Sequence, residues 1–328
     1  MTDWWLGGFG PDQDGTARGI SRMTSRADGS LELGPLVAGA PSPAYLVSAP
    51  GHLYAVAEGS GRVRSFRRDE DALAEDGLVE SGGESPCHLT LIDGALVVAN
   101  YMTGGLGVVL LDDAGTVGSL AQVIPGAGSG PHRAQDGPHA HASLRVDAAT
   151  VLSVDLGADR VFIHSVSGAV LTRTGELAFP PGTGPRDIAL HPSGLIYVLG
   201  EHAQDLHVLE RDGLGLRLVT SVALPGRASG DQAAAICFGP GGFVYAALRG
   251  SSQISVLRAS VDGRELEPVG AVSCEGDWPR HSVVHGDLLH VCNQLSNSVA
   301  TFRLGADGMP VLVADPTPAP SPSFLLPA

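Results

Sequence analysis

Residues 195–209 read LIYVLGEHAQDLHVL, and this stretch decides the fold. It holds a run of β-favouring residues, a polar turn, and a second run in which apolar and polar residues alternate. Similar text recurs in five further segments, which end at Phe66, Val109, His164, Leu257 and Phe302. One strand–turn–strand unit repeated along the chain predicts a repeat architecture.

The spacing of the copies identifies the kind of repeat. In each copy, the residue that ends the first strand lies six positions before the aliphatic residue that opens the second. These strand-ending residues are Ala57, Asn100, Asp155, Gly200, Leu248 and Asn293, with separations of 43, 55, 45, 48 and 45 residues. A period in the forties with several strands per unit is typical of β-propeller blades.

A further short strand precedes each copy and often opens with proline, as at Pro43, Pro86, Pro185 and Pro279. Proline suits the first residue of a strand, where no ladder donor is yet needed. The same text returns at residues 321–324, but no copy follows it, whereas residues 4–7 (WWLG) lack a preceding proline strand. We therefore expect residues 322–326 to pair into the same blade as residues 4–8, closing the ring and removing an exposed edge.

The sequence thus predicts an all-β chain in which residues 1–328 form a single seven-bladed β-propeller domain with four-stranded blades. Composition agrees with this prediction. The chain has 45 Gly and 23 Pro, which favour tight turns, and 43% apolar residues, which exclude disorder. Patterns of helical period are nearly absent.

The net charge and the cysteine spacing exclude several classes of partner and site. A net charge of −15 argues against nucleic acid and against anionic membranes as partners. Residues 1–10 carry no basic region followed by an apolar one, and no apolar run is long enough for a membrane helix. The four cysteines show no CxxC spacing, so neither a zinc site nor a redox pair is indicated. We expect a cytoplasmic protein without a cofactor; the oligomeric state stays open.

Equivalent positions of the copies should form rings around the propeller axis. Counting back 13 or 14 residues from each strand end gives one set: Ala44, Cys87, His141, Arg186, Ala234, Arg280 and Ser323. Counting forward by one gives a second set: Glu58, Tyr101, Leu156, Glu201, Arg249 and Gln294. A structural position should hold the same residue in every copy, and these do not. The polar members predict a site at one mouth of the channel.

Several motifs carry a family resemblance that spans nearly the whole chain. Residues 135–141 (QDGPHAH) and 155–161 (DLGADRV) together resemble the paired motif of the seven-bladed lactonase family. This family includes a propeller-type 6-phosphogluconolactonase and a fungal carboxymuconate cyclase. Further matches are residues 85–89 (SPCHL) with Asn100-Tyr101, residues 182–186 (GTGPR), and residues 278–280 (WPR) with Asn293-Gln294.

The resemblance implies a pocket that holds histidine, glutamate and several arginines. The matching catalytic candidates are His139, His141, Glu201, Arg186 and Arg280, and the substrate-binding candidates are Arg249, Tyr101, Gln135 and Gln294. The chain departs from the family at Asp187, Ala235 and Leu248, where the family usually or often has His, Glu and Asn. These departures leave the substrate specificity open.

The chemistry of this set fits lactone opening. A base must activate water, and donors must hold the developing oxyanion. Glu201, His139 or His141 could be the base, and arginine can serve as oxyanion donor or grip an anionic group. Three arginines exceed the need of one oxyanion, which indicates a small anionic lactone. The expected reaction is hydrolysis of a sugar lactone, 6-phosphogluconolactone to 6-phosphogluconate, in carbohydrate metabolism through the pentose phosphate pathway.

Other interpretations remain open at this point. His139 and His141 could bind a metal, since alternate residues of a strand point the same way, but no third ligand is identifiable. The chain could instead be a lactonising cyclase or a non-catalytic interaction scaffold. Asp155 and Asp159 are interpreted as structural turn residues.

Overall fold

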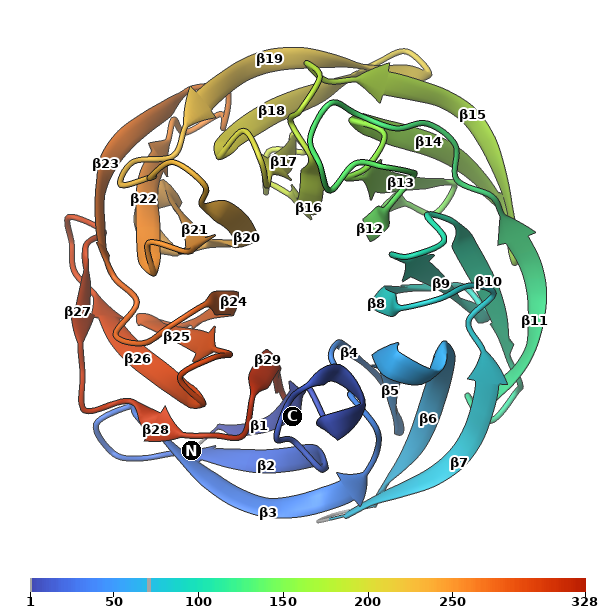
Figure 1. The fold of residues 1–328 in the computed structure, drawn as a ribbon, viewed down its shortest axis with the longest axis horizontal. Coiled ribbons are helices and arrows are strands. Elements are labelled where there is room, and N and C mark those ends of the chain that lie inside the picture. The colour runs from blue at the N-terminus through green and yellow to red at the C-terminus, as the bar shows by residue number, and fades with distance from the viewer. Residues whose placement is uncertain (1, 70–71) are drawn as a thin grey trace. The chain divides into compact units, whose positions relative to one another are not determined.

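The computed structural model describes residues 2–69 and 72–328 and contains seven antiparallel sheets (Figure 1). In the described part of the chain, the helical segments are three short 3₁₀ turns, Pro11–Gln13, Glu58–Ser60 and Pro240–Gly242. The predicted all-β class is therefore confirmed. None of the helical segments among these residues is long and apolar enough to cross a membrane.

The contacts within the chain define two compact units. Unit 1 comprises Met1–Leu6, Arg22–Pro35 and Arg186–Ala328, and unit 2 comprises Gly7–Ser21 and Leu36–Pro185. That residues 1–328 form a single domain stays a prediction.

Unit 2 contains three complete four-stranded sheets, each with its strands in chain order. Their strands are β4 (Leu46–Ala49), β5 (His52–Ala57), β6 (Arg62–Asp69) and β7 (Ala72–Glu80); β8 (Pro86–Ile92), β9 (Ala95–Asn100), β10 (Leu106–Leu111) and β11 (Val117–Ile124); and β12 (Ala140–Asp147), β13 (Thr150–Asp155), β14 (Arg160–Ser167) and β15 (Val170–Ala178).

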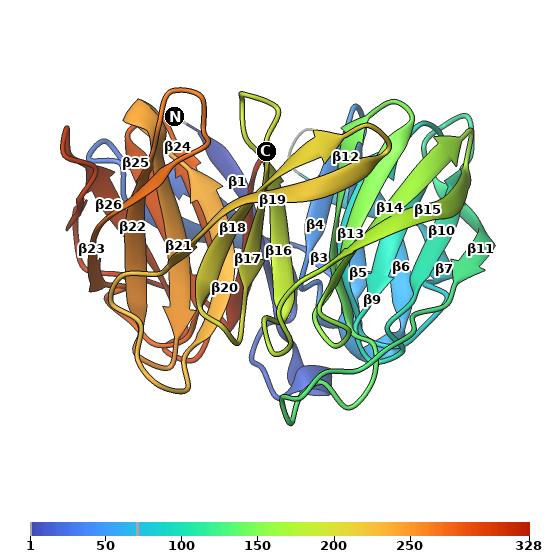
Figure 2. The same ribbon diagram turned by 90° about the horizontal axis from the view of Figure 1, so that it is seen from above.

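Unit 1 contains three further sheets of the same plan, and Figure 2 shows β20 to β23 running next to one another. Their strands are β16 (Pro185–Leu190, all but its first residue in unit 1), β17 (Ile196–Gly200), β18 (Asp205–Asp212) and β19 (Gly215–Ala223); β20 (Gln232–Phe238), β21 (Phe243–Arg249), β22 (Gln253–Ala259) and β23 (Leu266–Ser273); and β24 (Pro279–His285), β25 (Leu288–Asn293), β26 (Ser298–Leu304) and β27 (Pro310–Leu312), with β28 (Thr317–Pro318) also paired to β26.

The seventh sheet joins the two ends of the chain. Its order is β29 (Pro322–Pro327), β1 (Asp3–Gly8), β2 (Gly19–Ser25) and β3 (Leu31–Gly39), and the boundary between the units passes through β1, β2 and β3. The prediction that the C-terminal strand pairs into the N-terminal blade is confirmed. The backbone of Ala328 also donates to the carbonyl of Asp3, so pairing continues to the last residue.

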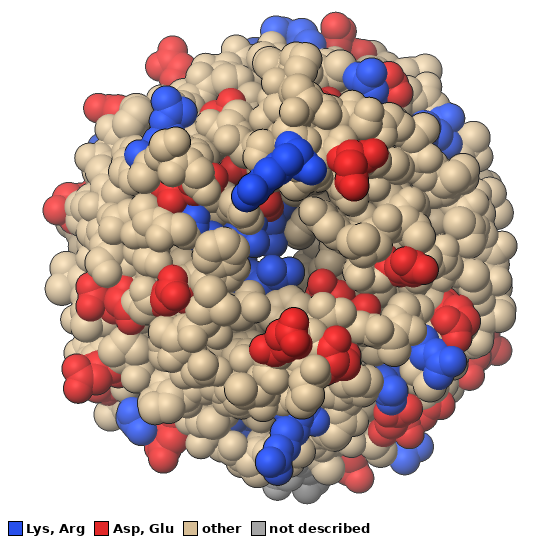
Figure 3. All heavy atoms as spheres, in the orientation of Figure 1, with Lys and Arg blue, Asp and Glu red and all other residues tan. Residues whose placement is uncertain are grey.

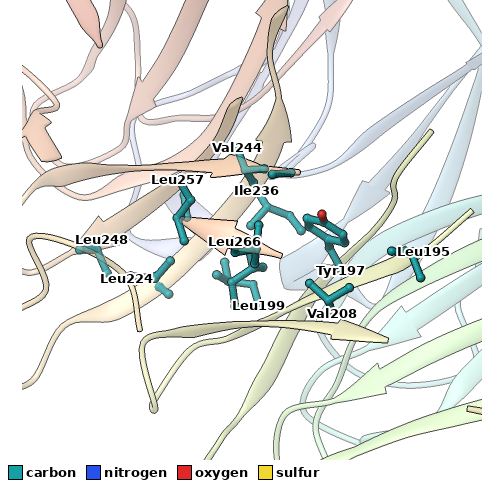
Figure 4. Packing of buried hydrophobic residues seen from close by; sticks show 14 residues of the cluster. Leu195, Tyr197, Leu199, Val208, Leu224, Ile236, Val244, Leu248, Leu257 and Leu266 are labelled. Carbon is teal, nitrogen blue, oxygen red and sulfur yellow. The ribbon is translucent and has the colours of Figure 1, made fainter. Parts of the chain in front are cut away.

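Buried aliphatic and aromatic side chains join the sheets of unit 1. Every residue of β17 and β21 is buried, as expected for strands that other elements cover on both faces. Figure 4 shows the packing of Tyr197 and Leu199 from β17 with Val244 and Leu248 from β21. The apolar runs recognised as repeats therefore form the core that fixes the polar ends of the same strands.

Two fully buried histidines predict how stability depends on pH. His164 in unit 2 contacts Ser153, and His290 in unit 1 contacts Thr301 and the ring of Trp4. Burial, with a smaller contribution from Arg173 or His285 respectively, lowers the pKa of each to about 4, from an ordinary value of 6.5. The unfolded chain therefore binds more protons than the folded chain between these values, and stability falls as the pH is lowered through this window.

We expect the free energy of unfolding to fall by up to about 1.4 kcal/mol per pH unit for each of these histidines between pH 6.5 and pH 4. Urea unfolding at pH 7, 6 and 5 measures this slope. His164→Asn should make the slope shallower, and an unchanged slope in that variant would contradict the assignment.

Candidate functional site

Three charged residues of unit 1 lie at equivalent ends of neighbouring strands. Arg186 is the second residue of β16, Glu201 directly follows β17, and Arg249 is the last residue of β21. All three are buried, with 5%, 7% and 5% of their surface exposed. The repeat offset that selected them in the sequence therefore places them at one end of their strands.

Glu201 forms ion pairs with both arginines. Its Oε2 atom lies 2.8 Å from Nε of Arg186 and accepts a 2.6 Å hydrogen bond from Nη2 of Arg249. Arg186 also donates through Nη1 to the carbonyl of Ala234, and Arg249 donates through Nε to the carbonyl of Gln232 at 3.3 Å. One carboxylate oxygen and two β20 carbonyls thus fix both guanidinium groups in place.

These charges determine the ionisation of Glu201. Burial alone would raise the pKa of its carboxyl group, but Arg249 and Arg186, with smaller contributions from His202 and Arg280, hold the pKa below its ordinary value. Glu201 is therefore an anion at neutral pH, and a lowered pKa weakens it as a proton acceptor.

Arg280 belongs to the same group. It is the second residue of β24, the strand that lies beside β20, and its charge acts on both Glu201 and Arg249. Burial lowers the pKa of Arg249 to about 9, with Arg186 and Arg280 acting in the same direction and Glu201 opposing them. Arginine stays charged at neutral pH, so three cations act on the carboxylate of Glu201. Figure 3 shows basic side chains set below the surrounding surface on the side where Figure 1 labels β16, β20 and β24.

The neighbours of these arginines on β16 and β24 have structural roles. Asp187 accepts a 2.9 Å hydrogen bond from the backbone of Ile236 on β20, and burial raises the pKa of its carboxyl group. His281 packs against Phe324 with ring centroids 4.0 Å apart, and burial, with the charge of Arg186, lowers its pKa to about 3. Leu248, another departure from the family pattern, lies in the apolar core.

The predicted histidines lie in unit 2, where they form an aromatic group with Tyr101. The ring of Tyr101 stacks on His139 with centroids 4.6 Å apart and meets His141 edge-on at 5.9 Å. Nδ1 of His139 lies 2.9 Å from the carbonyl of Tyr101, which can only accept, and Nε2 lies 3.2 Å from a carboxylate oxygen of Asp136. Both ring nitrogens of His139 therefore lie close to oxygen atoms of the protein.

Gln135 is fully buried in unit 2 and its amide group is used inside the protein. Nε2 donates to the carbonyl of Leu156 and to Asp159, both at 2.8 Å, and Oε1 accepts from the backbone of His132 at 3.0 Å. Asp159 also accepts from the backbone of Gly184, and Asp155 accepts from the backbone of His139. These aspartates order the loops, in agreement with their structural interpretation, whereas substrate binding by Gln135 stays a prediction.

Gln294 directly follows β25 in unit 1. Its backbone donates to the carbonyl of Trp278 at 3.1 Å. Its Oε1 atom is buried, and no described residue donates a hydrogen bond to it. Buried polar atoms normally have a partner, and substrate binding by Gln294 stays a prediction.

Two residues of the arginine group were missed by sequence reasoning. His202 lies with Nδ1 3.9 Å from Oε1 of Glu201, and Trp278 lies with its ring centroid 5.3 Å from the guanidinium carbon of Arg249. Both directly adjoin motif positions, because His202 follows Glu201 and Trp278 precedes the Pro279-Arg280 pair. Across the described residues, no three His, Cys, Asp or Glu side chains are grouped so that they could hold a metal ion.

Comparisons with known proteins agree on one family. A family model described as lactonase, 7-bladed β-propeller, matches residues 5–327. A protein named 6-phosphogluconolactonase from Bacillus subtilis is 30% identical over 288 residues, which cover 82% of each chain.

Solved structures show the same fold. The periplasmic gluconolactonase PpgL of Pseudomonas aeruginosa superposes with a TM-score of 0.93 and 25% identity, covering 100% of this chain and 99% of that one. A protein from Lactobacillus plantarum gives a TM-score of 0.92 at 24% identity, covering 100% and 99%. Together with the family model, these structures confirm the predicted seven-bladed propeller fold.

Proposed function

The chain belongs to the seven-bladed β-propeller lactonase family, and on that premise we propose that its substrate is a phosphorylated sugar lactone, 6-phosphogluconolactone. Membership makes the chain a lactonase, an enzyme that opens lactones by hydrolysis. The identity of the lactone and the roles of the residues are the proposal. It rests on one observation above all, the group in which the charges of Arg186, Arg249 and Arg280 all act on the buried carboxylate of Glu201.

The charge of this group favours an anionic substrate. Glu201 neutralises one of the three guanidinium charges, so the group keeps a net positive charge in a setting where burial strengthens electrostatic attraction. Guanidinium groups bind phosphate and carboxylate through paired hydrogen bonds. A phosphate on the sugar and the oxyanion formed during ring opening are the two negative groups that such a surplus can hold.

In the proposed reaction, a water oxygen attacks the lactone carbonyl carbon while a base accepts a proton from that water. The carbonyl oxygen becomes an oxyanion held by guanidinium donors. The bond between the carbonyl carbon and the ring oxygen then breaks, and the ring oxygen takes up a proton to become a hydroxyl group. The product is the open hydroxy acid, and no further reactant is needed.

Glu201, His139 and His141 remain the candidates for the base. Glu201 has a lowered pKa and an oxygen already shared by two arginines, so its contribution is chiefly to hold Arg186 and Arg249. In a mechanism with a histidine base, Nε2 of His139 is the nitrogen that accepts the proton, since Nδ1 lies against the carbonyl of Tyr101. A pH–rate profile tests Glu201 as the base, because a glutamate base with a lowered pKa gives an acid limb below pH 4.5.

Replacing Arg186 by Lys should raise KM for 6-phosphogluconolactone by about 10- to 100-fold, the worth of one charge-assisted hydrogen bond. Lysine keeps the charge but cannot contact both Glu201 and the carbonyl of Ala234. Steady-state kinetics measures the change. Arg217→Lys on β19, where the side chain is half-exposed, is the matched control and should leave KM unchanged. Equal KM values for wild type and Arg186→Lys would contradict the proposed grip.

A further inference from the structure

The backbone of Trp278 adopts a conformation that is energetically unfavourable for a bulky side chain. Its φ angle is +61°, in the left-handed region that bulky residues rarely adopt. The same position recurs directly before a proline in five copies of the repeat, and φ is positive in all five. The residues are Ser42, Ser85, Gly184, Trp278 and Ser321. Four of the five copies use a small residue.

In three of these copies, Ser42, Ser85 and Trp278, the carbonyl of this residue accepts a hydrogen bond from the backbone of the residue that directly follows the second strand of the blade. The carbonyl of Trp278 accepts from the backbone of Gln294 at 3.1 Å, and the carbonyl of Ser85 accepts from Tyr101 at 2.9 Å in the same way. The fold therefore requires the backbone conformation, and serine satisfies it elsewhere. It does not require an indole, so the fold alone gives no reason for tryptophan at this position.

The indole has a partner in the arginine group. The guanidinium carbon of Arg249 lies 5.3 Å from the centroid of the Trp278 ring, within the range of a cation–π contact. Arg249 is otherwise fixed by Glu201 on one edge and by the carbonyl of Gln232 on another. The guanidinium carbon lies over the face of the indole ring. The ring can therefore limit tilting of the guanidinium plane, which hydrogen bonds at the edges of that plane leave free.

We propose that Trp278 is a positioning residue for Arg249, whose guanidinium plane it holds in the orientation that binds the anionic group of the substrate. The contact with Arg249 is a property of the structure, while the identity of the anion rests on the proposed function. The strained backbone of Trp278 thus accompanies an ordered guanidinium group at Arg249. Strained residues often occur at functional sites.

The test compares Trp278→Gly with Trp278→Phe. Glycine relieves the positive φ and removes the ring, whereas phenylalanine keeps both the strain and an aromatic face. We expect Trp278→Gly to bind 6-phosphogluconate and inorganic phosphate about 3- to 30-fold more weakly in calorimetry, with a matching rise in KM and a nearly unchanged kcat. Its urea unfolding midpoint should not fall, and Trp278→Phe should recover most of the affinity.

Glu275→Gly is the matched control. Glu275 lies three residues earlier with φ +53° and an exposed side chain, so the change relieves the same kind of strain without touching Arg249. Its affinity for both probes should equal that of wild type. Equal affinity in wild type and Trp278→Gly would overturn the proposal, as would a Trp278→Phe variant as weak as Trp278→Gly.

Fluorescence tests the contact independently of any lactone chemistry. Trp4 and Trp5 are buried and contribute equally to wild type and Trp278→Phe, so the difference between their spectra isolates Trp278. Arg249→Lys should shift this isolated emission, because it removes the planar cation from the ring face. If the protein bound neither 6-phosphogluconate nor phosphate, the proposed function would be contradicted. The emission spectrum would still test whether Trp278 contacts Arg249. An emission unaffected by Arg249→Lys would refute the inference.

Discussion

Glu201→Gln is expected to lower kcat for lactone hydrolysis by about 10²- to 10⁴-fold, whether Glu201 is the base or the anchor of the arginines. It should also destabilise the fold by about 3–5 kcal/mol, because Arg186 and Arg249 would remain buried without their counter-charge. The sequence alone predicts the catalytic loss with an intact fold, and the structure adds the loss of stability. Steady-state kinetics well below the unfolding midpoint, with urea unfolding in parallel, measures both.

Glu210→Gln on β18 is the matched control for this variant. Glu210 also pairs with two arginines, Arg217 and Arg264, but those side chains are 52% and 40% exposed. Exposed pairs contribute about 0–1 kcal/mol, so both activity and stability should stay close to wild type. A Glu201→Gln variant that behaved like Glu210→Gln would contradict the role assigned to Glu201.

Deleting residues 321–328 is expected to abolish stable folding. The deletion removes β29, exposes the edge of β1, and takes away Phe324 and Leu325, which are buried in unit 1. Each buried side chain contributes about 2–5 kcal/mol, so their loss together with the ladder is comparable to the whole stability of about 5–15 kcal/mol. Circular dichroism and urea unfolding of the truncated chain provide the measurement.

Deletion of Ala328 alone is the control for the truncation. It removes one backbone hydrogen bond, to Asp3, and leaves the buried residues of β29 in place. Its unfolding midpoint should lie close to that of the full chain. A chain lacking residues 321–328 that unfolded at the same urea concentration as the full chain would show that β29 is dispensable.

The sequence predicted the fold well because the residues of its repeat reflect where the backbone forms strands and turns. The alternation of residues, the spacing of the turns and the prolines that open strands such as β16 and β24 are local features. The complementary ends of the chain followed from counting the copies. The same offsets selected Arg186, Glu201 and Arg249, since equivalent positions of neighbouring blades lie at equivalent ends of their strands.

The sequence could not show which side chains of neighbouring blades contact one another. Nothing local in the sequence reveals that two arginines share one oxygen of Glu201 and that they lower the pKa of its carboxyl group. Burial of the Gln135 amide depends in the same way on a residue 24 positions away, Asp159. Trp278 left a local signal, a bulky residue where other copies carry serine or glycine, but its meaning required the φ angle and the position of Arg249.

The most direct test of the central claim is the specificity of the purified protein for a phosphorylated lactone. The measurement is kcat/KM for 6-phosphogluconolactone and for unphosphorylated gluconolactone under the same conditions, corrected for spontaneous hydrolysis. If the three arginines bind an anionic substrate, both lactones should be opened and the phosphorylated one should be preferred by about tenfold or more, the worth of one charge-assisted contact. Equal values for the two lactones, or no hydrolysis of either, would contradict the account.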